Sequence, residues 1–141
     1  MKISGGIKAN DVIFIAGSNG MVGSAITRLL KDNIKKNHQS NILLTPSRDE
    51  IDLCSYDSVF KWFEEYKPNI IINAAAKVGG INANYSFPVE FLLNNLKIQN
   101  NIIEASYRFN ARRLLFLGSS CIYPKNCKQP IKEEYLMSSP L

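Results

Sequence analysis

The segment Gly118-Ser119-Ser120-Cys121-Ile122-Tyr123-Pro124 carries two side chains that can take part in proton transfer. The Ser119 hydroxyl can hydrogen-bond a substrate carbonyl or hydroxyl, and the Cys121 thiol can exchange a proton if its pKa is lowered. The segment follows an apolar run that predicts a strand, so both groups are expected at the carboxyl end of that strand. A second interpretation stays open, in which both residues only terminate the strand and Cys121 is a small buried apolar side chain.

A second chemical pattern lies near the start of the chain, where Gly17, Gly20 and Gly23 recur at every third position. A β-branched apolar run precedes them and an amphipathic helix pattern follows, and this order predicts a phosphate-binding unit. Gly17 is expected to permit the tight turn, Gly20 to let the backbone approach a pyrophosphate, and Gly23 to let the helix pack closely on the strand. The N–H groups and the positive dipole end of the helix then face the phosphates.

The segment after the second expected strand bears on the choice of dinucleotide. An acidic residue at the end of this strand binds the ribose 2′-hydroxyl of NAD, whereas a nearby arginine accommodates the 2′-phosphate of NADP. Here Thr45-Pro46-Ser47-Arg48 places no acid directly at the strand end, and both Ser47 and Arg48 can donate to a phosphate. The pattern favours NADP(H). The alternative is that Arg48 only pairs with Asp49 or Glu50 at the surface.

Alternating strand and helix patterns supply the scaffold that positions these residues. Helices are expected at 20–36, from a cap within 55–58 to an end at Pro68, and from 88 to about 109. Strands are expected at 12–16, 41–45, 69–76 and 114–118. This alternation predicts an α/β fold, a Rossmann-type doubly wound parallel sheet of strand order 3-2-1-4 with helices on both faces.

Two of these expected elements carry unusual residues. The alanines Ala74, Ala75 and Ala76 close the third strand, where they either leave room for a ligand or pack under a helix. The long third helix holds Asn94, Asn95, Asn100 and Asn101. Asparagine is a mediocre helix former, so packing rather than propensity must hold this helix.

Composition bounds the remaining possibilities. The 141 residues are 45% apolar and 21% charged, which is typical of one globular domain, and the net charge of +5 accompanies no recognised nucleic-acid-binding module. The cysteines Cys54, Cys121 and Cys127 have no metal-ligand spacing and form an odd set, which favours a reducing compartment, and His38 is expected at the surface of a loop. No apolar stretch approaches the ~20 residues that span a bilayer. We expect a cytoplasmic protein with no nucleic-acid or membrane partner and no metal.

The chain resembles the GDP-L-fucose synthases, a family of the extended short-chain dehydrogenase/reductases. The resemblance covers nearly the whole chain after the leader and rests on the glycine segment, on Arg48-Asp49-Glu50, on Ala74-Ala75-Ala76-Lys77-Val78-Gly79-Gly80-Ile81 and on 114–124. It implies that the complete enzyme epimerises two ring carbons of GDP-4-keto-6-deoxy-D-mannose and reduces the ketone with NADPH to make GDP-L-fucose. It also implies that Ser119 is the catalytic serine that polarises the keto oxygen and that Cys121 is the proton-exchanging residue of the epimerisation.

The resemblance further implies which residues hold the NADP(H) cofactor. The glycine segment would bind the pyrophosphate, Arg48 the 2′-phosphate, the run to Leu53 would line the adenosine, and the segment from Leu117 would contact the reactive end. The full expected set is Gly17, Ser18, Asn19, Gly20, Met21, Val22, Gly23, Arg48, Asp49, Glu50, Ile51, Asp52, Leu53, Ala74, Ala75, Ala76, Leu117, Gly118, Ser119 and Ser120. Asn19 stands where family members often have an arginine that also touches the 2′-phosphate, which weakens the NADP preference.

The superfamily also uses a Tyr-x-x-x-Lys pair, and no tyrosine here has a lysine four residues later. By the resemblance, this pair, the later strands and the sugar-binding domain lie beyond Leu141. We therefore expect a leader at 1–11 and an incomplete NAD(P)-binding Rossmann domain at 12–141, truncated before the later strands and without a substrate domain.

Several functional hypotheses follow for a chain of this kind. Expected partners are a nucleotide cofactor, a GDP-sugar only in the complete enzyme, a second copy in a homodimer, and a polypeptide that carries the C-terminal half. The alternatives are a catalytically inactive nucleotide-binding remnant, one half of a split enzyme, or another NAD(P)-dependent nucleotide-sugar epimerase or dehydratase.

Overall fold

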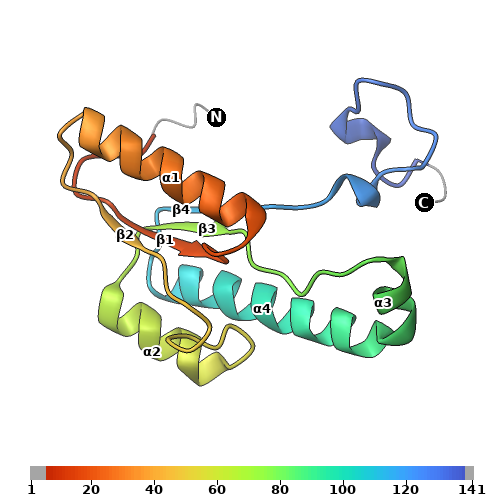
Figure 1. Cartoon of the computed structure of the whole chain (residues 1–141), viewed down its shortest axis with the longest axis horizontal. Coiled ribbons are helices and arrows are strands. Elements are labelled where there is room, and N and C mark those ends of the chain that lie inside the picture. The colour runs from red at the N-terminus through yellow and green to blue at the C-terminus, as the bar shows by residue number, and fades with distance from the viewer. Residues whose placement is uncertain (1–5, 139–141) are drawn as a thin grey trace.

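The computed structural model describes residues 6–138, and in them a parallel β-sheet lies between two layers of helices (Figure 1). The strands are β1 (Val12–Ala16), β2 (Ile42–Leu44), β3 (Ile70–Asn73) and β4 (Arg113–Phe116). The helices are α1 (Met21–Lys36), α2 (Tyr56–Tyr66), α3 (Ile81–Ser86) and α4 (Pro88–Arg108), followed by the short 3₁₀ turns η1 (Ser120–Ile122) and η2 (Glu133–Tyr135). The predicted α/β class and the doubly wound parallel architecture are confirmed.

The strand order is β2-β1-β3-β4, so the predicted order 3-2-1-4 is wrong. Every residue of β3 is buried, and a strand buried on both faces belongs in the interior of a sheet rather than at an edge. The three residues of β2 are half-buried or exposed, as suits an edge strand. β3 therefore pairs with β1 on the side opposite β2, with Ile13 beside Ile70 and Ala16 beside Asn73.

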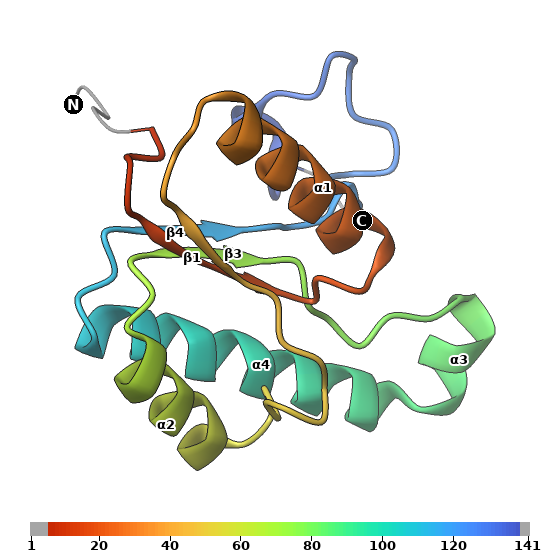
Figure 2. The same cartoon turned by 60° about the vertical axis from the view of Figure 1, so that its left-hand side comes forward.

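The two faces of the sheet carry separate cores because alternate residues of a strand point to opposite sides. Ile13 and Ile15 of β1 and the isoleucines of β3 that share their face pack against α1. Phe14 and Ala16 point the other way, into a cluster built from α2 and α4 that includes Val59, Phe63, Ile98 and Ile102. Figure 2 shows α1 over one face and α2 with α4 over the other.

The helix boundaries follow local signals in the sequence. Ser55 caps α2 by accepting a hydrogen bond from the Ser58 N–H (3.3 Å). The C-cap of α2 is Lys67, whose φ of 45° is left-handed, directly before the buried Pro68. α1 matches the expected helix, and His38 lies exposed in the turn beyond it. α3 is not among the expected elements. Among the described helices, none combines the length and the apolar character needed to cross a membrane.

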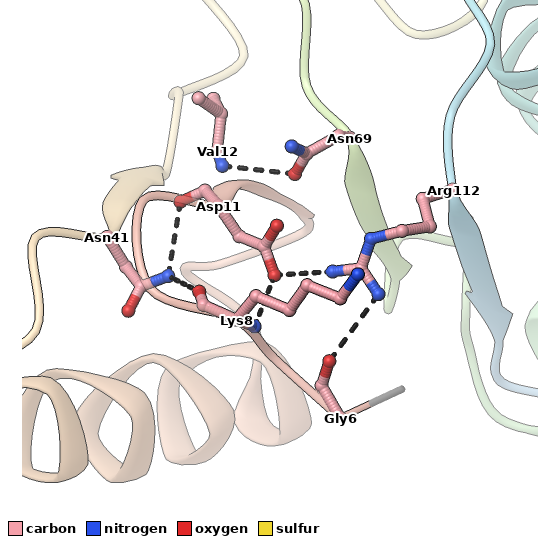
Figure 3. Close-up of polar contacts among 7 residues, drawn as sticks. All are labelled: Gly6, Lys8, Asp11, Val12, Asn41, Asn69 and Arg112. Carbon is pink, nitrogen blue, oxygen red and sulfur yellow. Dashed lines mark hydrogen bonds and ion pairs between the residues drawn. The ribbon is translucent and has the colours of Figure 1, made fainter. Parts of the chain in front are cut away.

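A largely buried ion pair joins the residue before β1 to the residue before β4 (Figure 3). Asp11 is only 4% exposed, and its carboxylate accepts hydrogen bonds from the Lys8 backbone N–H (2.6 Å) and the Arg112 guanidinium (2.5 Å). Burial acts to raise the pKa of Asp11, but the Lys8 hydrogen bond and the Arg112 charge outweigh it and hold the pKa below its usual value. The predicted leader at 1–11 is irregular where described, yet its last residue, Asp11, is buried, and residues 1–5 lie outside the described residues.

Two asparagines add further hydrogen bonds at the amino edge of the sheet. The Asn69 side chain accepts from the Val12 N–H (3.1 Å), while its backbone carbonyl accepts from the Arg112 N–H (2.8 Å). Asn41 donates to the Lys8 carbonyl (2.6 Å) just before β2 begins. Residues at the starts of all four strands are thus connected by polar contacts, which fix the sheet at the edge opposite the glycine loop.

Candidate functional site

The carboxyl edge of the sheet gathers the loops that the sequence analysis singled out. All strand pairings are parallel, so the segments that follow β1, β2, β3 and β4 emerge at the same edge. From β1 the chain goes to β2 on one side and then returns to β3 on the other side. This reversal makes the gap between the ends of β1 and β3 a topological switch point, where open α/β sheets bind ligands.

Two glycines of the loop after β1 are required by the chain itself. Gly17 has a φ of 77°, and a Cβ there would lie 2.7 Å from the Ala74 carbonyl oxygen. A Cβ on Gly23 would collide with the Gly17 carbonyl group, with the Gly17 carbonyl carbon only 2.7 Å away. The predicted steric roles of Gly17 in the turn and of Gly23 in close helix packing therefore agree with the geometry. The loop is held against both the segment after β3 and the first turn of α1.

The third glycine is the least constrained of the three on the protein side, although a Cβ there would make one tight contact. Gly20 has φ −75° and ψ 171°, which any residue adopts, and a Cβ there would meet only the Gly17 carbonyl oxygen at 3.3 Å. Gly20 caps α1 without a side-chain hydrogen bond, and the first turn of α1 holds no acidic residue, so its N–H groups face outward unopposed by negative charge. The Ser18 hydroxyl is buried beside them and has no hydrogen-bond partner within residues 6–138. Packing within the chain explains the lack of a side chain at Gly20 less well than at Gly17 and Gly23. A phosphate bound at the N–H groups of the first turn of α1 would explain it.

The loop after β2 presents an unpaired arginine. Arg48 is exposed and makes no ion pair within the described part of the chain, so the alternative of a surface pair with Asp49 or Glu50 is not seen. The Glu50 carboxylate instead accepts from the Ser47 backbone N–H (2.7 Å), and this contact together with the Ser47 hydroxyl lowers the pKa of Glu50. Ile51 is buried in the core, which anchors the run from Arg48 to Leu53. The Arg48 guanidinium is left available to an anion.

The loop after β3 begins earlier than expected, because the strand ends at Asn73 and the alanines lie beyond it. The Asn73 side chain turns the chain by accepting from the Ala75 N–H (3.1 Å). Ala75 packs against the α2 and α4 core, as the packing alternative required, whereas Ala76 is exposed. Ala74 and Ala75 also border the glycine loop, since the space that a Cβ on Gly17 would need is filled by their backbone.

The sequence analysis did not assign two asparagines of α4 that hold these loops. Asn95 accepts from the Lys77 N–H (2.7 Å) and donates to the Lys77 carbonyl (3.0 Å). Asn101 is 9% exposed and donates to the Leu53 carbonyl (3.0 Å), 48 positions away in the sequence. The unusual number of asparagines in one helix is the signal that could have identified them. α4 therefore fixes one point on each loop that flanks the glycine loop.

The segment after β4 carries the predicted proton-transfer groups on an exposed stretch. Leu117 still pairs with the sheet, through its N–H to the Asn73 carbonyl (3.2 Å), and Figure 1 shows the chain then running away from the sheet. The Ser119 hydroxyl caps η1 by accepting from the Cys121 N–H (3.1 Å). Both Ser119 and Cys121 are exposed, so the interpretation of Cys121 as a buried apolar residue is wrong. Their catalytic roles stay predictions.

Comparison with known proteins places this geometry in a family. Residues 13–141 match the model of the NAD dependent epimerase/dehydratase family. The chain is 48% identical over 129 residues to Putative GDP-L-fucose synthase 2 of Arabidopsis thaliana, covering 92% of this chain and 38% of that protein. Further GDP-L-fucose synthases match at similar identity, among them the Escherichia coli enzyme at 44%, so the resemblance to this family is confirmed.

Solved structures share the fold. A GDP-mannoheptose C4 reductase from Campylobacter jejuni with NADP bound matches with a TM-score of 0.85 and 38% identity, over 96% of this chain and 39% of that one. A GDP-L-fucose synthetase from Naegleria fowleri bound to NADP matches with a TM-score of 0.78 and 30% identity, over 95% of this chain and 38% of that one. The chain spans little more than a third of the length of these relatives. With its glycine loop at the switch point and a family match over nearly its full length, the chain belongs to the NAD-dependent epimerase/dehydratase family.

Proposed function

We propose that the chain binds NADP(H) at the carboxyl edge of its sheet and forms the cofactor-binding portion of an epimerase-reductase that makes GDP-L-fucose from GDP-4-keto-6-deoxy-D-mannose. The observation that carries this proposal is the glycine loop at the β1/β3 switch point, where Gly17 and Gly23 are sterically required and Gly20 is much less constrained. Two further points support NADP(H), namely the free Arg48 and the NADP bound in two similar structures.

The residues present fit a pyridine dinucleotide. The N–H groups at the start of α1 and the buried Ser18 hydroxyl would hold the pyrophosphate, and the Arg48 guanidinium would hold the 2′-phosphate. The bound coenzyme supplies a hydride for ketone reduction. Ala74 to Ala76 and the run from Arg48 to Leu53 would line the adenosine, on either side of the glycine loop.

Ser119 and Cys121 are the groups of this chain proposed to act on the sugar. Because the Ser119 oxygen accepts its contact from the Cys121 N–H, the hydroxyl hydrogen stays free to donate to a keto oxygen. The exposed Cys121 thiol can take or return a proton at a ring carbon during epimerisation. We expect no ketone reduction from these 141 residues alone, because the sequence has no Tyr-x-x-x-Lys pair to protonate the reduced oxygen. Turnover of the nucleotide sugar with NADPH in highly purified protein would contradict this expectation.

The glycine loop is tested by substituting Gly20, the least constrained of its three glycines. Gly20→Ala should keep the fold after a small shift of the Gly17 carbonyl, yet place a methyl group where the pyrophosphate approaches. We expect NADPH affinity to fall at least tenfold in calorimetry. Gly80→Ala is the matched control, since Gly80 also caps a helix with nearly the same backbone angles and has nothing within 4 Å of a Cβ. Equal NADPH affinity in the two variants would overturn the proposed site.

The cofactor preference is tested at Arg48. A charge-assisted contact to a phosphate contributes about 1.5–3 kcal/mol, so Arg48→Ala should weaken NADPH binding about tenfold to hundredfold. NADH carries no 2′-phosphate, and its affinity should change little. If the affinities for NADPH and NADH fall equally, Arg48 does not contact the 2′-phosphate.

We further propose that the complete activity needs a second polypeptide or a longer chain that supplies the rest of the relatives' length. Within residues 6–138, β4 is hydrogen-bonded to a strand on one side only. Its exposed residues Leu115 and Phe116, with the adjoining Leu117, form an apolar edge that a further strand could cover. A polypeptide that carries the C-terminal half would be such a partner, and association of two copies is the homodimer that the resemblance implies. Co-expression with a downstream gene product, followed by light scattering, separates these two outcomes.

A different nucleotide sugar is the second candidate substrate. A similar structure is a GDP-mannoheptose C4 reductase, and a relative 39% identical to this chain is a GDP-L-colitose synthase from Yersinia pseudotuberculosis. Turnover of each GDP-linked 4-keto sugar by the completed protein distinguishes the alternatives.

A further inference from the structure

We propose that Asn95 and Asn101 of α4 are positioning residues that hold open the two sides of the nucleotide site. This inference rests on the proposed function, and it assigns a role to residues that lie on a helix behind the sheet. The strand order puts the glycine loop between the segment after β2 and the segment after β3. α4 makes a side-chain contact to each of these two segments and therefore sets their separation.

The side-chain contact to the adenosine side is one partly buried hydrogen bond. Asn101 donates its side-chain amide to the Leu53 carbonyl (3.0 Å) and is 9% exposed, while Ile98 and Ile102 beside it are packed in the core. The segment it holds begins at Arg48, the proposed ligand of the 2′-phosphate. Ile51 is buried in the core and Leu53 packs against it, so the hydrogen bond from Asn101 adds a polar contact to a segment that apolar packing already holds.

The contact to the opposite side is a two-point clamp. Asn95 accepts from the Lys77 N–H (2.7 Å) and donates to the Lys77 carbonyl (3.0 Å), so one side chain satisfies both polar groups of a residue that no strand or helix includes. The Lys77 side chain is also engaged, through its ion pair with Glu90 of the same helix. Lys77 directly follows Ala74 to Ala76, whose backbone borders the glycine loop.

Asparagine at these positions is costly for the helix. Within the described residues, the hydrogen bonds of the Asn95 and Asn101 side chains all go to the two loops. Its helix propensity is lower than that of alanine, and shape alone would allow an apolar residue to fill the core beside Ile98 and Ile102. An asparagine side chain instead provides hydrogen bonds to backbone groups of Lys77 and Leu53, which lie in loops and outside any helix or strand. A helix that carries two such amides holds both loops in one rigid frame, so the site needs no ordering when the ligand binds.

The test uses the full 141-residue chain, with NADP⁺ and 2′,5′-ADP as probes. Asn101→Ala removes the donor to Leu53, and we expect the dissociation constants of both probes to rise about fivefold, which corresponds to about 1 kcal/mol. Asn95→Ala should raise the dissociation constant of NADP⁺ by a similar factor. Ser106→Ala is the matched control, because Ser106 is equally buried on α4 and its hydroxyl donates only within the helix, to the Ile102 carbonyl (2.6 Å). It should lower the melting temperature and leave both dissociation constants unchanged.

Amide hydrogen exchange provides a readout that does not depend on nucleotide. Exchange at residues 52–54 should quicken about fivefold in Asn101→Ala, and at residues 77–79 in Asn95→Ala, with neither change in Ser106→Ala. Faster exchange with unchanged dissociation constants would overturn the positioning role, and so would equal weakening of binding in Ser106→Ala. If the unsubstituted chain binds neither probe while the exchange pattern is as expected, the proposed function fails and the clamps are purely structural.

Discussion

The buried pair of Asp11 and Arg112 at the amino edge leads to an asymmetric prediction for its two partners. Asp11 is 4% exposed, whereas the Arg112 side chain keeps 30% of its surface in solvent. Arg112→Met retains the aliphatic stem but leaves the buried Asp11 carboxylate with only the Lys8 N–H as a hydrogen-bond donor. We expect the free energy of unfolding to fall by about 2–3 kcal/mol. This value is below the full cost of breaking a buried pair because solvent already screens Arg112.

Asp11→Asn should cost less, about 1 kcal/mol. The asparagine oxygen can still accept from the Lys8 N–H, and the freed Arg112 guanidinium can turn to water. Urea unfolding followed by the fluorescence of Trp62, the single tryptophan, measures both changes, since Trp62 packs against Phe14 (ring centroids 6.3 Å apart). An Asp11→Asn loss that equals or exceeds the Arg112→Met loss would refute this reasoning.

The same pair sets a dependence on pH with a defined sign. The pKa of Asp11 is lowered in the folded chain, so its contribution to stability is present above the pKa of the unfolded chain and is lost as the pH falls through the folded value. The deficit of Arg112→Met relative to the unsubstituted chain should therefore shrink between roughly pH 7 and pH 3, because protonation removes the charge that Arg112 compensates. A deficit that stays constant over this range would contradict the assignment.

Three further substitutions test the packing. Ser55→Ala removes the cap of α2 and should cost about 1 kcal/mol in urea unfolding, and a loss below about 0.3 kcal/mol would mean that the cap contributes little. Gly23→Ala would drive a methyl group into the backbone of Gly17, and we expect a loss of more than about 2 kcal/mol, whereas Gly80→Ala should be close to neutral. Phe63→Ala empties a site that is 0% exposed and should cost about 3–5 kcal/mol in the same assay, and a loss under about 2 kcal/mol would show that the cavity collapses.

Features fixed by neighbouring residues were predictable from the sequence. The turn at Gly17, the close approach at Gly23 and the cap at Ser55 depend on local backbone geometry, which residue type reports directly. The alternation of strand and helix likewise gave the fold class. The free Arg48 was predictable as a chemical group, although its lack of an ion pair depends on Glu50 turning to Ser47 instead.

Features set by distant parts of the chain were not predictable in this way. The strand order depends on which strand is buried on both faces. The sequence of an apolar run such as Ile70 to Ile72 does not identify the strands that pair with it. Asn101 contacts Leu53 from 48 positions away, so its partner could not be read from spacing. The exposed setting of Cys121 also depends on where the chain runs after β4 (Figure 1).

The pairing of β1 with two neighbours has a consequence for the order of events during synthesis. β1 needs β3 on one side, and their connection through Asn69 and Val12 spans 57 positions, while the Asp11 carboxylate meets its guanidinium only 101 positions later. A nascent chain that has left the ribosome as far as α2 thus exposes one whole flank of its first strand. Parallel pairings of this separation make folding slow relative to helical bundles, so a chaperone that shields that flank would raise the yield of native protein.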